Sequence, residues 1–276
     1  MTAKKAAKKA ATTAASTAAN TAATTAARTP PQPAATGNAA PVADPLSRKE
    51  IDALRRLDTP TVCNALEVLD PGAFASGFTS KPFFCAFPAL GSMVGYACTG
   101  TIRASRPAAR SADEQRDLRF TWFDYVAGLP APRIVVLQDV DERVGYGAFW
   151  GEVQSNIHKA LGCAGVVTDG SVRDIDTAAK GFQFLAGSAS PSHAYVHMVE
   201  FGNRVDVHGM SVGSGDLVHA DRHGAVVIPH ALARGVVDAA ARVARIEAVV
   251  IGACTARGFS VAKLKDAIVR STQGSY

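Results

Sequence analysis

Helical spacing of apolar residues begins near residue 47 of the chain. Ser47 is a favourable N-cap residue, and Glu50 stands three positions later, which is the spacing of a capping box. A second helix is predicted over about residues 59–69, because Pro60 suits the first helical turn. The Pro-, Gly- and Phe-rich stretch 70–91 is typical of a loop.

Beyond residue 92 the pattern alternates between strand-like and helix-like segments. A helix is predicted over about 111–127 with Trp122 and Tyr125 in the core, another over 152–161, and a long C-terminal one over about 230–256. Several of the predicted strands follow one another without a helix between them, which indicates a layered α/β domain rather than a regular Rossmann or TIM repeat. The predicted strands cover residues 93–102, 133–137, 165–168, 182–185, 194–207, 216–220 and 225–228.

The first 45 residues differ in composition from the remainder. They are dominated by Ala and Thr and have almost no large apolar side chains, so we expect a disordered tail, followed by one domain over 46–276. Residues 1–43 hold five basic residues and no acid, which equals the net charge of +5 of the whole chain. The tail could contact nucleic acid as a weak basic arm, and an organelle transit peptide is a less favoured alternative.

Composition narrows the class of protein further. The chain of 276 residues is 47% hydrophobic and 19% charged, and it has no apolar run long enough for a membrane span. Its five cysteines include no CxxC pair, which argues against a disulfide framework and a thiolate zinc site. We therefore expect a protein of the reducing cytoplasm.

The densest group of candidate functional residues lies in 139–176. Gly145, Gly147 and Gly151 bracket a loop that opens into a helix, and such a loop can bind an anion through backbone amides. The spacing matches neither a dinucleotide fingerprint nor a Walker loop, and a flexible turn remains the alternative. Asp139 and Asp141, close before the loop, are expected in a solvated segment.

Three charged residues flank this loop and the next buried strand. Glu152 begins the helix, either as a carboxylate favoured by the helix dipole or as part of a metal site. Arg173 and Asp174 follow a strand that is predicted to end in an Asp169–Gly170 turn. The pair could hold a substrate carboxylate and a divalent cation, or it could be a surface ion pair.

Two pairs of histidines do not favour a metal site. His193 and His197 are four residues apart, but on a strand this spacing places them about 13 Å from each other. His219 and His223 flank a predicted hairpin turn and are expected at the surface.

Four segments of the chain occur in a distinctive order: GE (151–152), GVVTDGSVRD (165–174), GSASP (187–191) and GDLVHADRHGAVVIP (215–229). With these segments the chain resembles the RraA-like proteins over about residues 47–260. That family includes the class II 4-hydroxy-4-methyl-2-oxoglutarate/4-carboxy-4-hydroxy-2-oxoadipate aldolases and the regulator of ribonuclease E activity. The resemblance implies an α/β/α sandwich of the swivelling-domain type with a long C-terminal helix, assembled as a homotrimer or homohexamer.

The resemblance also implies roles for particular residues. Asp174 would be the direct ligand of Mg²⁺ or Mn²⁺, Arg173 would contact the substrate, and Glu152 would hold a metal-bound water. Glu247 is the best match to a glutamate that reaches the metal waters from a neighbouring subunit. The backbone amides expected to hold the substrate carboxylate are those of Gly151, Glu152, Val153 and Gln154.

These roles imply a metal-dependent lyase that cleaves a small 2-oxo acid through a stabilised pyruvate enolate. An aldolase, an oxaloacetate decarboxylase or both would use the same intermediate, because a dication and Arg173 can stabilise its charge. A non-catalytic regulator of a ribonuclease, acting through protein–protein contacts, is the alternative that the family leaves open.

Overall fold

The computed structural model describes residues 42–72 and 75–273, so nearly all of the predicted tail over 1–45 lies outside the described residues. Within the described part, no helix is both long and apolar enough to span a membrane. The helices are α1 (Arg48–Leu54), α2 (Thr59–Leu69), α3 (Ala112–Gly128), α4 (Glu152–Ala160), α5 (Val236–Thr255) and α6 (Val261–Gln273). The strands are β1 (Phe84–Cys85), β2 (Met93–Arg103), β3 (Arg133–Asp139), β4 (Ala148–Trp150), β5 (Cys163–Val172), β6 (Gln183–Ala189), β7 (His197–Phe201), β8 (Val205–Val207), β9 (Met210–Val212), β10 (Leu217–Asp221) and β11 (Gly224–Ile228).

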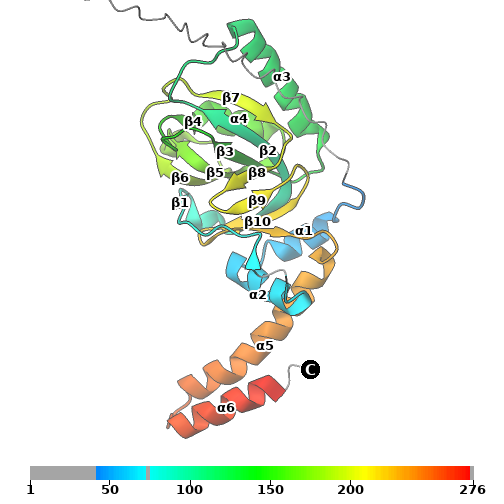
Figure 1. Cartoon of the computed structure of the whole chain (residues 1–276). Coiled ribbons are helices and arrows are strands. Elements are labelled where there is room, and N and C mark those ends of the chain that lie inside the picture. The colour runs from blue at the N-terminus through cyan, green and yellow to red at the C-terminus, as the bar shows by residue number, and fades with distance from the viewer. Residues whose placement is uncertain (1–41, 73–74, 274–276) are drawn as a thin grey trace, which may run out of the picture. The chain divides into compact units, whose positions relative to one another are not determined.

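A curled mixed sheet forms the centre of the fold (Figure 1). Its main path runs β1-β6-β5-β3-β2-β10-β11, and its four inner strands β6, β5, β3 and β2 are parallel to one another. The two ends of the path are antiparallel, and β7 pairs with the second half of β2. Strand β4 pairs in parallel with the last residues of β5.

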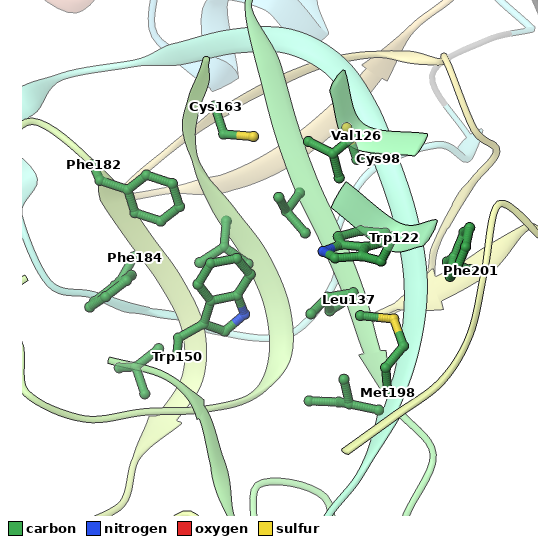
Figure 2. Close-up of a cluster of buried hydrophobic side chains, with 14 of the residues drawn as sticks. Cys98, Trp122, Val126, Leu137, Trp150, Cys163, Phe182, Phe184, Met198 and Phe201 are labelled. Carbon is green, nitrogen blue, oxygen red and sulfur yellow. The ribbon is translucent and has the colours of Figure 1, made fainter. Parts of the chain in front are cut away.

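Both faces of the inner strands are buried, and alternate residues of β3 show this directly. Val135 and Leu137 face a cluster that includes Trp122 of α3 and Trp150 of β4, and Figure 2 shows both tryptophans within this cluster. The intervening Val136 faces the opposite cluster, which the β8–β9 hairpin covers. A third cluster packs α1, α2 and the start of α5 against β2, β10 and β11. The α/β class and the long C-terminal helix are therefore confirmed.

Local signals placed the early helices correctly. Ser47 caps α1, and the reciprocal hydrogen bonds with Glu50 complete the predicted capping box. The Asp58 side chain accepts a hydrogen bond from the Thr61 amide at the start of α2, with Pro60 in the first turn.

Some boundaries were wrong. Strand β5 continues through Asp169 and Gly170, because pairing first with β3 and then with β4 carries the backbone past the expected turn. The predicted strand over 194–207 is two strands, β7 and β8, since they join different sheets. The long helix begins at Val236 after a short 3₁₀ turn. Helix α6 and strand β9 lie in segments for which no element was predicted.

His219, expected at the surface, is fully buried. It lies on β10 beneath the start of α2, where its Nδ1 accepts a hydrogen bond from Thr59 Oγ1 at 3.1 Å. Its Nε2 donates to the Leu54 carbonyl at the end of α1, at 3.2 Å. The hairpin turn does exist, but the two helices that pack over β10 remove this side chain from solvent.

Asp139 and Asp141 were also expected in a solvated segment, yet both are buried. Asp139 accepts the backbone N–H groups of Asp141 and Gly145 at 3.0 and 2.8 Å. The carboxylate of Asp169 in turn accepts the Asp139 N–H at 2.7 Å. These hydrogen bonds hold the loop that leads into β4 in place. They also replace the hydrogen bonds to water that the buried carboxylates have lost.

Burial of Asp169, reinforced by the negative charge of nearby Asp139, raises its pKa to about 6, although the Asp139 N–H opposes this shift. The folded protein therefore binds the carboxyl proton of Asp169 more tightly than the unfolded chain does. The contribution of Asp169 to stability is fully present below its unfolded pKa and falls as the pH rises through about 6.

We expect Asp169→Asn to be more stable than the wild type at pH 8 by up to about 3 kcal/mol, because the amide removes the buried charge but still accepts the Asp139 N–H. The difference should shrink towards zero at pH 4. Urea unfolding followed by circular dichroism between pH 4 and 8 measures it, with Asp124→Asn on the exposed face of α3 as the control. Equal stability of Asp169→Asn and the wild type at pH 8 would contradict the raised pKa.

Candidate functional site

Pairing of β4 with β5 brings the two halves of the candidate site together. Trp150 of β4 lies opposite Val172 of β5, and the Arg173 N–H donates to the Trp150 carbonyl at 2.8 Å. Because the strands are parallel, Gly151 and Arg173 leave them at the same edge of the sheet. This edge is where α/β folds generally bind ligands.

The absence of a side chain at Gly151 leaves the space that the Asp174 carboxylate occupies at this edge. A Cβ on this residue would lie 2.5 Å from Asp174 Oδ2 and 3.2 Å from Arg173 Cγ. Gly151 is also the N-cap of α4 and provides no side-chain hydrogen bond to the helix. The first turn of α4 therefore meets the Asp174 carboxylate directly, with 3.4 Å between the Glu152 nitrogen and Oδ2.

Asp174 adopts a left-handed backbone conformation, with φ of 50°. Aspartate tolerates this region better than most residues, but it is uncommon outside glycine and is enriched at functional sites. The conformation turns the chain sharply at the end of β5. Arg173 Nε lies 3.6 Å from Asp174 Oδ2, and the two side chains remain 38% and 40% exposed. A small ligand can therefore reach both charges.

The oxygen atoms at this edge suit a hard divalent cation. Asp174 and Glu152 are both exposed beside the N-terminus of α4. Within residues 42–72 and 75–273, no group of three or more His, Cys, Asp or Glu side chains is placed to hold a metal. A cation held mainly by Asp174 would keep most of its water, which is the usual state of Mg²⁺ in proteins.

The structure does not bring Glu247 to this edge within one chain. Glu247 is exposed on α5, and α5 packs against α1, α2 and α6. A contribution of Glu247 from a neighbouring subunit therefore stays a prediction.

A buried histidine that sequence reasoning missed anchors α4. His158 accepts a hydrogen bond at Nε2 from Trp122 Nε1 at 2.9 Å and donates from Nδ1 to the Gln154 carbonyl at 2.8 Å. Burial lowers its pKa to about 4, so the ring is neutral near pH 7. Ser155, one turn earlier, accepts the Ala179 N–H. Ser155 and His158 are three residues apart and therefore lie on the same side of the helix, and this spacing is the sequence signal that could have indicated a buried His158.

A groove of about 570 Å³ begins at Arg173 and at Val153 and Gln154 in the first turn of α4, and it runs beneath α3. It was not foreseen, because its two walls come from segments about 70 residues apart. Its lining residues from outside α4 and Arg173 are Pro107, Ala108, Gln115, Arg119, Trp122, Phe123, Ala148, Phe149 and 193–198.

Comparison with known proteins shows the fold and the family of the chain. No curated protein matched the chain. A protein from Pseudomonas syringae pv. tomato, described as uncharacterized, is 23% identical with a TM-score of 0.60, over 82% of this chain and 96% of that one. A structure described as a novel cellulase from gut-associated microbes has 17% identity and a TM-score of 0.61, over 74% and 88% of the two chains.

RraAS2 from Streptomyces coelicolor, described as an unusual member of the RNase ES inhibitor RraA family, is also similar. It is 22% identical with a TM-score of 0.54, over 74% of this chain and 96% of that one. At these identities the likenesses show the fold alone. The sequence model of the RraA-like family, described as Aldolase/RraA, matches residues 59–227, which contain the β4–α4 junction and the Arg173–Asp174 pair. The chain therefore belongs to the RraA-like family.

Proposed function

We propose that this protein is a divalent-metal-dependent lyase that cleaves a small 2-oxo acid and releases pyruvate. One observation carries the proposal: an accessible carboxylate, Asp174, lies beside the Arg173 guanidinium and the N-terminus of α4. Cation, guanidinium and helix amides are three kinds of group that stabilise negative charge on adjacent oxygens.

Asp174 would hold Mg²⁺ or Mn²⁺ directly, and Glu152 would bind one of the water molecules of the ion. The bound ion supplies Lewis acidity for the 2-oxo group of the substrate. The amides of the first turn of α4 would donate hydrogen bonds to the substrate carboxylate, aided by the helix dipole. His158 keeps this turn in place through the Gln154 carbonyl.

Arg173 would stabilise the charge that develops during cleavage. In the aldol reaction the substrate hydroxyl loses a proton and becomes a carbonyl, the C–C bond breaks, and its electron pair passes to the pyruvate fragment, which then takes up a proton. The charge rests largely on the 2-oxo oxygen, where a guanidinium acts as a fixed cation. Decarboxylation of oxaloacetate leaves the same fragment, so we propose it as a companion activity.

The active assembly would be a homotrimer or homohexamer in the cytoplasm, with Glu247 of one subunit completing the site of the next. Interaction with a ribonuclease is the other activity that the family offers, and the first experiment below separates the two. Contact of the basic tail with nucleic acid remains a weaker prediction.

We expect pyruvate release from oxaloacetate or a 4-hydroxy-2-oxo acid to require Mg²⁺ or Mn²⁺ and to fall at least about 100-fold in Asp174→Ala, because the proposed ligand of the ion is lost. A lactate dehydrogenase-coupled assay measures it, and Asp124→Ala on the exposed face of α3 is the matched control. Unchanged turnover in Asp174→Ala would refute the assigned role. Stoichiometric binding of a ribonuclease without any turnover would favour the regulatory function instead.

The shared site gives a second prediction. Asp174→Ala and Glu247→Ala should each be nearly inactive alone, yet refolding them together should restore about a quarter of wild-type activity, because a random closed oligomer then contains some sites with both native residues. The pyruvate assay on the mixture measures the recovery, and each variant refolded alone is the control. No recovery would place Glu247 outside the neighbouring site.

A further inference from the structure

The groove beneath α3 has an unbalanced charge. Two arginines, Arg119 of α3 and Arg173 of the candidate site, line it, and His193 and His197 line the opposite wall. None of its lining residues is an aspartate or glutamate. Arg173 pairs with Asp174 at one end of the groove, whereas Arg119 has no acidic partner within the described residues, so its charge favours an anionic occupant.

Two amide side chains that line the groove each have a buried polar atom without a hydrogen-bond partner within the described residues. The Nε2 atom of Gln115 and the Oε1 atom of Gln154 are both inaccessible to water and make no hydrogen bond within the described residues. A buried polar atom without a partner lowers stability, because it has lost its hydrogen bonds to water and gained none in the protein. Both side chains are only partly buried and line the groove, so it offers a polar occupant amide groups as well as charge.

The base of the groove is apolar. Trp122, Phe149 and Met198 line it, and Figure 2 shows Trp122 and Met198 in the buried cluster below. An apolar base of this kind fits the carbon chain that joins the two polar ends of a ligand. Arg173 and Gln154 belong both to the groove and to the candidate site, so an occupant of the groove is continuous with a 2-oxo acid bound at Asp174.

From these contacts we propose that the groove between α3 and residues 193–198 is a distal substrate subsite within one chain, and that Arg119 selects substrates with a second carboxylate there. This inference rests on the proposed function, because it assumes that the 2-oxo acid end lies against Arg173 and the start of α4. It assigns recognition of the remote half of the substrate to residues outside the Arg173–Asp174 pair.

Binding of two ligands of equal chain length tests the subsite. With the Mg²⁺-loaded full-length protein, isothermal titration calorimetry should show that 2-oxoglutarate binds at least about tenfold more tightly than 2-oxopentanoate, which lacks the second carboxylate. Arg119→Gln should remove most of this difference and leave the affinity for 2-oxopentanoate within about twofold of the wild type.

Arg116→Gln is the matched control, because Arg116 lies on α3 but pairs with Asp113 and Asp117 and does not line the groove. It should bind both ligands as the wild type does. Arg119 is exposed on the helix, so its replacement should leave the fold intact, which circular dichroism verifies. Gln115→Met provides a second variant in the groove and should also weaken 2-oxoglutarate binding.

Equal affinity of the wild type for the two ligands, binding of neither, or a full preference retained in Arg119→Gln would each overturn the subsite. The outcome does not depend on turnover. If the preference is lost in Arg119→Gln but no pyruvate is released from any 2-oxo acid, the subsite stands as a binding site and the proposed lyase activity fails.

Discussion

The candidate site depends on one short piece of strand pairing. Strands β4 and β5 pair at only two register positions, and one of them sets Trp150 beside Val172. The residues that follow the two strands therefore leave the sheet at the same edge. Gly151 has no side chain to separate them, so the N-terminus of α4 approaches Asp174 closely. Without this contact, the helix amides, the carboxylate and the guanidinium would be three unrelated surface groups.

Packing below the site explains how so short a pairing can hold. Trp150 is fully buried and contacts the His158 ring edge to face, with 4.8 Å between ring centroids. His158 in turn bonds to Trp122 of α3. The strand before the site and the helix after it therefore share one rigid core, which restricts movement of the first turn of α4. The core also forms the base of the groove, so the same side chains support both parts of the proposed substrate site.

Buried charges support the loop on the other side of β4. Asp139 and Asp169 are linked through the Asp139 N–H, and the Asp139 carboxylate holds the Gly145 amide. This arrangement costs stability, because burial raises the pKa of both carboxyl groups. Its effect is to fix the loop before β4, which contains Gly145 and Gly147 and would otherwise be free to move. The loop is ordered by Asp139 and Asp169, whose burial the pattern of residues along the chain did not predict.

The sequence by itself determined the local elements and the identity of the chemical groups. Capping residues placed α1 and α2, apolar runs placed the inner strands, and the order of motifs led to Glu152, Arg173 and Asp174. Capping and strand signals depend on neighbours within a few positions, and the motifs depend on the order of residue types, so both can be read from a linear chain.

Only the tertiary structure decided the burial of His219 and Asp139, the continuation of β5 through Asp169, and the groove between Arg119 and the 193–198 segment. Each of these results from contacts between residues far apart in the chain. Helix packing over β10 buries His219, and the groove needs walls from two separate segments. Such distances are set by how sheets and helices close on one another, which spacing along the sequence does not encode.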